Sequence, residues 1–235
     1  MTPLIVQEWG NEAWSTIWIL FGLASFAAFL PTIWAIRNLH ENAADQSISS
    51  PDKLPLARMW AALTSYFLFG LGYLIYLTFL VAWMRSEGES PVLIAVTWSI
   101  MGIATMFSPF VWRGILARSN GGEAMAYSGL VTGLGVLSAV VVSAPWGVLV
   151  SAALVGIAFY IVPTSATNFG RKNFPQEQWG RSFAAFTIVF SIGQILGPFA
   201  AGVLTDLTND ISVGLTMAGA ILILCAAAAA LQRPL

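Results

Sequence analysis

The sequence predicts an all-α membrane protein with seven transmembrane helices, and two observations lead to that prediction. First, 57% of the 235 residues are apolar and only 9% are charged, whereas a soluble domain usually carries about 25% charged residues. Second, the apolar residues gather in seven long stretches that have no charge in their central portions. A soluble helical bundle would need a charged outer face on every helix, so the composition argues against that class.

Each stretch is long enough for a helix to cross a bilayer, which takes about 20 residues. In chain order the stretches lie at roughly 13–36, 59–84, 92–112, 125–143, 146–164, 183–204 and 211–231. Pro31 is expected to kink the first span, and Ser143-Ala144-Pro145 is expected to form a tight hairpin between the fourth and fifth spans. The longest connection, 37–58, is polar and contains several Pro and Ser residues, which indicates a flexible linker.

Lysine and arginine gather on one side of the predicted protein. Of the 10 basic residues, only Arg85 falls on the side opposite to the linker. The others are Arg37, Lys53, Arg58, Arg113, Arg118, Arg171, Lys172, Arg181 and Arg233. Because positively charged connections stay in the cytoplasm, the pattern predicts a cytoplasmic C-terminus. The odd number of spans then places the N-terminus outside.

The chain offers few residues for catalysis. His40, the only histidine, lies in the linker, which excludes histidine-based acid–base chemistry within the membrane. The single cysteine, Cys225, and the lack of any cluster with metal-ligand spacing predict no metal site and no cofactor. The only lysines, Lys53 and Lys172, lie in connections, so the last span cannot hold retinal. We therefore expect neither an enzyme nor, at a net charge of −1, a nucleic-acid partner.

Polar aromatic residues and glycines remain as candidate functional residues. Tyr73 and Tyr76 in the second span are three residues apart and share a helix face. Gln194 places an amide near the middle of the sixth span, where it needs a partner or water. Cavity lining and ordinary helix packing both stay open as interpretations. Positions expected at close helix contacts or hinges are Gly70, Gly72, Gly129, Gly133, Gly193, Gly197 and Pro198.

Two segments carry a resemblance to a known family. Phe69-Gly70-Leu71-Gly72-Tyr73, followed by Thr78-Phe79-Leu80, is similar to the seventh helix of a major facilitator superfamily transporter of the bacterial YbfB/YjiJ-like group. Gly193-Gln194-Ile195-Leu196-Gly197-Pro198 is similar to the eleventh helix of that group. The cytoplasmic motif Gly-x-x-x-Asp-Arg-x-Gly-Arg/Lys of the superfamily is degenerate here, because Ala117 precedes Arg118 where the motif has aspartate.

The resemblance covers nearly the whole chain, as helices six to twelve of a twelve-helix fold. It implies that residues 1–36 are the last helix of an N-terminal half and that 37–58 are the cytoplasmic linker. Residues 59–235 would then form the six-helix C-terminal half. The resemblance further implies a fragment that needs the missing N-terminal half as its partner for transport.

The function implied by the resemblance is secondary transport of a small organic solute by alternating access in the bilayer of the bacterial cytoplasmic (inner) membrane. Substrates of such folds bind near the midplane, and the family's cavity helices correspond to the second, third, fifth and sixth spans. The cavity candidates are Tyr73, Tyr76, Thr97, Trp98, Tyr160 and Gln194. Two alternatives from other classes stay open, a seven-helix receptor or sensor and a structural membrane scaffold.

Overall fold

The computed structural model of the chain describes residues 13–38, 54–142 and 145–235. The predicted features at His40, in the middle of the linker and at Ser143 and Ala144 lie outside the described residues. The chain divides into two compact units, Met1–Pro51 and Asp52–Leu235. The first unit contains helix α2, Ala13–Asn38, with Pro31 inside it. This helix covers the first predicted span, and its apolar stretch runs over Trp18–Trp34.

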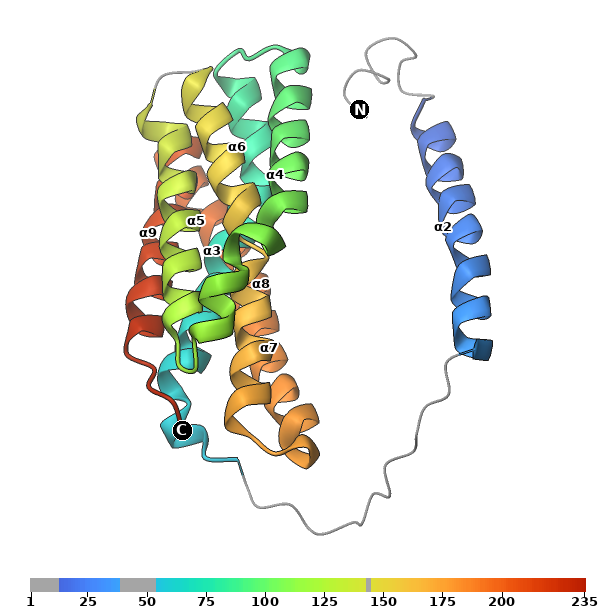
Figure 1. The fold of residues 1–235 in the computed structure, drawn as a ribbon. Helices are drawn as coiled ribbons and strands as arrows, with labels where there is room; N and C mark the ends of the chain where they lie inside the picture. The colour runs from blue at the N-terminus through green and yellow to red at the C-terminus, as the bar shows by residue number, and fades with distance from the viewer. Residues whose placement is uncertain (1–12, 39–53, 143–144) are drawn as a thin grey trace. The chain divides into compact units, whose positions relative to one another are not determined.

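The second unit is a bundle of helices that run back and forth between two ends (Figure 1). Within the described residues, six segments are long and apolar enough to cross a membrane. This finding confirms the predicted class, an all-α membrane protein. The elements of the second unit are η2 (Leu56–Arg58), α3 (Trp60–Ser86), α4 (Pro91–Arg118), α5 (Glu123–Val141), α6 (Trp146–Ala158), α7 (Ile161–Asn173), η3 (Gln176–Gln178), α8 (Trp179–Thr208) and α9 (Ile211–Ala230).

Helix α4 is longer than the sequence predicts. The third predicted span ends at residue 112, before the first arginine, but α4 continues to Arg118. Arginine is a good helix former, so its charge does not interrupt the backbone hydrogen bonds. The helix ends where Ser119 takes an extended conformation, with φ −73° and ψ 120°. Arg113 therefore lies on the helix itself, about 7.5 Å before its end at a rise of 1.5 Å per residue.

The fifth predicted span is interrupted between α6 and α7, at Phe159 and Tyr160. Pro163 explains the interruption, because proline has no N–H for the carbonyl of Phe159 four residues earlier and its ring crowds that carbonyl. Together the two helices, Trp146–Asn173, are long and apolar enough to cross a membrane as one segment. The sequence predicted an uninterrupted helix because the apolar run continues unchanged through Pro163.

Side chains of α4 support this interruption from the neighbouring helix. The Thr105 hydroxyl donates a hydrogen bond to the carbonyl of Gly156 at 3.0 Å. The Trp112 indole N–H donates to the carbonyl of Ile157 at 2.8 Å. Carbonyls at the end of a helix need such partners inside a membrane, where water cannot supply them. The contact fixes α4 against the end of α6.

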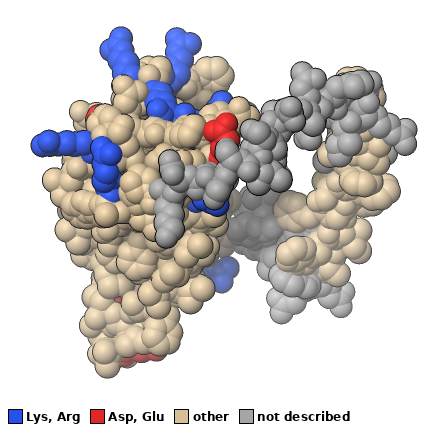
Figure 2. Space-filling view, turned by 90° about the horizontal axis from the view of Figure 1, so that it is seen from below, with Lys and Arg blue, Asp and Glu red and all other residues tan. Residues whose placement is uncertain are grey.

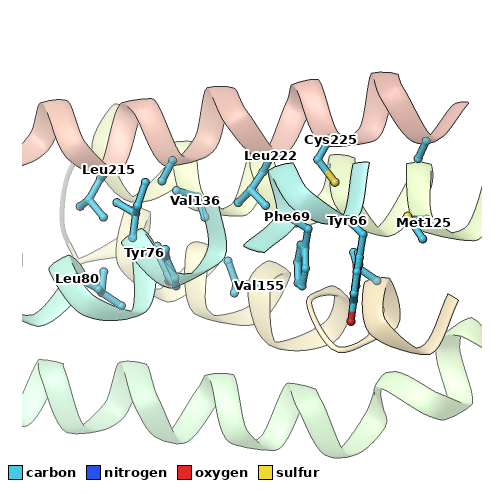
Figure 3. Packing of buried hydrophobic residues seen from close by; sticks show 14 of the residues in the cluster. Tyr66, Phe69, Tyr76, Leu80, Met125, Val136, Val155, Leu215, Leu222 and Cys225 are labelled. Atoms are coloured by element: carbon cyan, nitrogen blue, oxygen red, sulfur yellow. The ribbon is translucent and has the colours of Figure 1, made fainter. Parts of the chain in front are cut away.

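Helix α3 forms the centre of the core. The side chains of Phe69, Ile75 and Tyr76 are at most 1% exposed. Figure 3 shows Leu215 and Leu222 of α9 pointing toward α3. Apolar packing of this kind, together with close helix contacts, holds membrane helices in one arrangement. Residues on the remaining face of α3 therefore keep a fixed position relative to the neighbouring helices.

Basic side chains gather at one end of the second unit, which we call the basic end (Figure 2). The basic end contains the start of α3 and α8 and the end of α4, α7 and α9. Its basic residues at these helix ends are Arg58, Arg118, Arg171, Lys172, Arg181 and Arg233. Arg85 lies in the last turn of α3, at the opposite end.

Two side chains tie the helix ends together at the basic end. The Lys172 ammonium group, from α7, donates to the carbonyls of Leu116, Ala117 and Ser119 at 2.7–3.0 Å, where α4 ends. A cation is favourable there because the carbonyl end of a helix carries partial negative charge. The Gln232 side chain accepts from the N–H of Ala62 and donates to the carbonyl of Arg58, both at 3.1 Å. These bonds fix the C-terminal residues against the start of α3.

Candidate functional site

Two polar side chains meet between the middle of α3 and the middle of α8. Tyr73 is the fourteenth of the 27 residues of α3, and Gln194 is the sixteenth of the 30 residues of α8. The Gln194 amide donates a hydrogen bond to the Tyr73 hydroxyl oxygen. Both side chains are half-buried. Because polar groups at this depth must find partners or water, the pair is the natural starting point for a functional site.

Close packing of two backbones brings the pair together. A Cβ atom added at Gly70 of α3 would come within 2.5 Å of the carbonyl oxygen of Phe190 in α8. In the other direction, Cβ atoms added at Gly193 and Gly197 of α8 would meet the backbone of α3, at Phe67 and Leu71 respectively. Helices approach this closely only where side chains are absent. The glycines thus set the separation at which the amide of α8 reaches the phenol of α3.

Stacked aromatic rings surround the pair. The ring of Phe190 lies 5.6 Å from that of Tyr73 and 4.8 Å from that of Tyr66, measured between centroids. The ring of Tyr73 also stacks with Phe159, at 6.2 Å. Phe159 belongs to the interruption between α6 and α7, where it contacts Tyr160 at a centroid distance of 4.0 Å. The aromatic contacts therefore run from α3 and α8 to the broken helix.

The other cavity candidates differ in their surroundings. Tyr76 is 1% exposed, and its hydroxyl hydrogen-bonds with that of Ser151 in α6 at 2.8 Å. Thr97 is fully buried, and its hydroxyl donates to the carbonyl of Leu93 at 2.8 Å. Trp98 is half-buried and packs against the core. Tyr73 thus contacts Gln194 directly, and it contacts Tyr160 indirectly, through the ring of Phe159. Tyr76 and Thr97 are instead buried inside the bundle.

Tyr160 lies at a pocket of about 340 Å³ between α4 and the start of α7. The Tyr160 side chain is 54% exposed. Arg113, Ser108 and Thr105 line the pocket from α4. The prediction from sequence missed Arg113, because the arginine was assigned to a connection between spans. The signal was present: Thr105, Pro109 and Arg113 are spaced by four residues and so share a helix face.

The remaining predicted positions lie at other helix contacts or within α8. A Cβ atom added at Gly72 would come within 2.7 Å of Leu222 in α9. Gly129 and Gly133 of α5 face α9, where added Cβ atoms would lie 3.1–3.3 Å from the nearest atoms. Pro198 lies inside α8, four residues after Gln194, so it offers no N–H to the carbonyl of Gln194. Whether these positions act as hinges remains a prediction.

Metal chemistry finds no support in the residues that the structure describes. No group of three His, Cys, Asp or Glu side chains is placed to hold a metal ion within the described ranges. Cys225 is buried and lies 3.3 Å from the hydroxyl of Ser65. At the centre of α3 and α8, the structure instead places a hydrogen-bonded phenol and amide beside stacked aromatic rings.

Comparison with known proteins identifies a family for this sequence. The model of a family described as "Uncharacterised MFS-type transporter YbfB" matches residues 2–230. No curated protein matches the chain. The match covers both units, including the two segments that carry the glycines of the α3–α8 contact.

Proposed function

The chain belongs to the family of MFS-type transporters represented by YbfB, and we propose that it carries a small organic solute across the membrane by alternating access. In transporters of this superfamily, the substrate site lies near the midplane between two parts that rock against each other. Residues Asp52–Leu235 would form one of these parts, and the opposite wall of the cavity would come from helices outside this unit.

The observation that supports a substrate site most strongly is the Tyr73–Gln194 pair. Both residues lie at the middle of long apolar helices, where an amide in lipid would be costly. Together the phenol and the amide offer donors and acceptors, and the neighbouring rings of Phe190 and Phe159 offer apolar surface. Ligand sites typically combine mostly apolar walls with a few polar groups. We therefore assign substrate contact to this pair and to Tyr160.

Alternating access requires a part that moves as a body. The backbone contacts of Gly70, Gly193 and Gly197 couple α3 to α8, so these two helices would move together. The interruption at Phe159 and Tyr160 provides a place where α6 and α7 can change their relative direction, because Pro163 has no N–H to donate to the carbonyl of Phe159. Tyr76, Thr97 and Trp98 remain candidates for a different state of the transport cycle.

The charge distribution supports an orientation. We propose that the basic end of the second unit faces the cytoplasm, because positively charged connections are retained there. The C-terminus would then be cytoplasmic and the N-terminus, preceding α2, would be outside. The bacterial cytoplasmic membrane fits this arrangement.

Counterflow in proteoliposomes tests the proposal. The chain is reconstituted together with an N-terminal half of the same superfamily fold, the partner that the resemblance implies, and with a high internal concentration of one unlabelled solute. Uptake of the same labelled solute is then followed across a panel of small organic molecules. We expect accumulation of at least one solute. Gln194→Ala should reduce its uptake about tenfold, because a half-buried hydrogen-bonding group of the proposed site is lost.

The matched control is Gln176→Ala, which makes the same chemical change at an exposed position in η3. This variant should transport like the wild type. The proposal fails if no solute accumulates in the wild type, or if both glutamine variants transport equally well.

A further inference from the structure

The pocket between α4 and α7 has an unusual combination of walls. One face of α4 contributes Thr105, Pro109, Arg113 and Leu116 at helical spacing. The start of α7 contributes Ile161 and its neighbours Tyr160 and Thr164. The volume of about 340 Å³ lies within the usual range of small-molecule sites, roughly 300–1,000 Å³. Most of the surface of this pocket is apolar, and the guanidinium group of Arg113 is its one charged group.

Two polar groups of this wall lack partners. Arg113 is exposed and makes no hydrogen bond or ion pair with any described residue. Ser108, five residues earlier on the same helix, is 1% exposed and its hydroxyl has no hydrogen-bond partner among the described residues. A buried hydroxyl without a partner is costly, since burial removes its bond to water. A guanidinium and a hydroxyl that both lack partners in one pocket indicate a missing acceptor.

The chemistry of the walls defines the acceptor. A guanidinium group binds a carboxylate with two parallel hydrogen bonds. One cation balances one negative charge, whereas a doubly charged phosphate would keep an uncompensated charge in an apolar pocket. Pro109, Leu116 and Ile161 offer contact to a hydrocarbon or aromatic body. The pocket therefore suits a monocarboxylate with an apolar body.

We propose that this pocket binds the carboxylate of an apolar organic acid through Arg113, with Ser108 as a second donor. The inference rests on the proposed function and deepens it, because it names such organic monoanions as the substrate class. Tyr160 links the two regions, since it lines the pocket and contacts Phe159, which stacks with Tyr73. The acid would thus meet Arg113 on its way between the basic end and the Tyr73–Gln194 pair.

Direct binding of labelled benzoate tests the inference. The purified full chain is immobilised in a neutral detergent, and retained benzoate is measured by scintillation proximity with unlabelled benzoate or benzamide as competitor. We expect benzoate to compete and its uncharged amide not to. Arg113→Gln should weaken binding about tenfold or more, the usual loss for a charge-assisted hydrogen bond. Arg118→Gln, an equal charge change on α4 outside the pocket, should bind within about twofold of the wild type.

Two further variants keep the test decisive if Arg113→Gln is poorly folded. Arg113→Lys retains the charge but loses the two-pronged geometry, so we expect an intermediate affinity. Ser108→Ala removes one donor and should weaken binding about threefold. Absence of benzoate binding to the wild type, equal displacement by benzamide, or equal loss in the Arg113→Gln and Arg118→Gln variants would overturn the inference.

A lipid headgroup offers the same anionic chemistry, and a second arm separates the two sources. Benzoate binding is repeated in nanodiscs of phosphatidylcholine alone and of phosphatidylcholine with phosphatidylglycerol. Similar Arg113-dependent binding in both supports a soluble acid, whereas its loss in phosphatidylglycerol assigns the pocket to lipid and overturns the inference. If an uncharged solute shows counterflow but benzoate does not bind, this inference is refuted and the proposed function still holds. Benzoate binding without counterflow of any solute would remove the proposed function alone.

Discussion

The contact between α3 and α8 gives a direct test of how the bundle is held together. Gly197 of α8 lies against the carbonyl of Leu71 in α3, so the methyl group of Gly197→Ala would overlap that carbonyl. Gly202 lies on the same helix, but a Cβ atom added there has no neighbour within 4 Å. Gly202→Ala is therefore a matched control in which the same methyl group enters open space.

The expected size of the effect follows from this difference. Alanine favours helix over glycine by about 0.5–1 kcal/mol, and both variants gain that term. Only in Gly197→Ala does the added methyl group overlap a packed neighbour, and this overlap destabilises the fold by about 1–3 kcal/mol. The two variants should therefore differ by about 1–3 kcal/mol in the free energy of unfolding. In a chain of 235 residues this corresponds to roughly 2–12 °C in the midpoint of thermal unfolding.

The assay is thermal unfolding in detergent, followed by size-exclusion chromatography of the protein that remains monodisperse after heating. We expect Gly202→Ala to melt at or above the wild-type temperature and Gly197→Ala to melt below it. Gly70→Ala, whose methyl group would lie 2.5 Å from the carbonyl oxygen of Phe190, should behave like Gly197→Ala. Equal midpoints for Gly197→Ala and Gly202→Ala would refute the close backbone contact.

Three further predictions concern single side chains. Tyr73→Phe removes the acceptor of the Gln194 amide and should cost about 1–3 kcal/mol, measured as a lower thermal midpoint together with reduced counterflow. Lys172→Met removes three bonds to the end of α4 and should cost about 1 kcal/mol, since the site is partly exposed to solvent. Gln232→Ala leaves the N–H of Ala62 without its partner and should increase hydrogen exchange at the start of α3.

Each of these variants has its own control. Tyr127→Phe removes a hydroxyl from an exposed tyrosine of α5 and should change neither stability nor transport. Lys172→Arg retains the cation and should melt close to the wild type. Exchange at the start of α5, measured in the same experiment, should be less affected by Gln232→Ala than exchange at the start of α3. The reasoning fails wherever a variant and its control give the same result.

The fold class could be predicted from the sequence because a membrane imposes a simple rule. Every span needs a long apolar run, and these runs are visible without knowledge of the neighbours. The family could also be predicted, from the glycine-rich segments around Gly70 and Gly193, and the match to residues 2–230 confirms it. These segments are recognisable because close backbone contact leaves glycine as the only choice.

Two features of the candidate site could not be predicted as readily. The interruption at Phe159 depends on Pro163, but a proline within an apolar run also occurs in α8, where Pro198 leaves the helix continuous. Neighbouring helices decide between these outcomes, and their contacts are not visible in local sequence. Arg113 was assigned to a connection because a charge usually marks the end of a span. The pocket that it lines with the unpartnered Ser108 exists only because α4 and α7 are packed together.

The hydrogen bond between Tyr73 and Gln194 could likewise not be predicted from local sequence. Sequence placed a polar residue in the middle of each helix, and helical spacing could say which face each occupied. Whether the two faces meet depends on the packing of α3 against α8 at Gly70, Gly193 and Gly197. Contacts between residues 121 positions apart follow from the arrangement of the whole bundle.

The central claim is that Gln194 borders a water-filled substrate passage, and thiol labelling tests it without knowledge of the substrate. The native chain has one cysteine, Cys225, which is fully buried. The full chain with the substitution Gln194→Cys is therefore expressed and prepared in membrane vesicles. The vesicles are exposed to a charged, membrane-impermeant methanethiosulfonate reagent. Ser151→Cys, a nearly isosteric change at a fully buried position, serves as the control.

We predict that the thiol at position 194 reacts while the native Cys225 and the thiol at position 151 do not, because a charged reagent enters water-filled passages and is excluded from lipid and from packed cores. If the thiol at position 194 stays as unreactive as Cys225 in protein that is present in the membrane, the α3–α8 pair faces lipid or packed protein, and its assignment to a transport passage is contradicted.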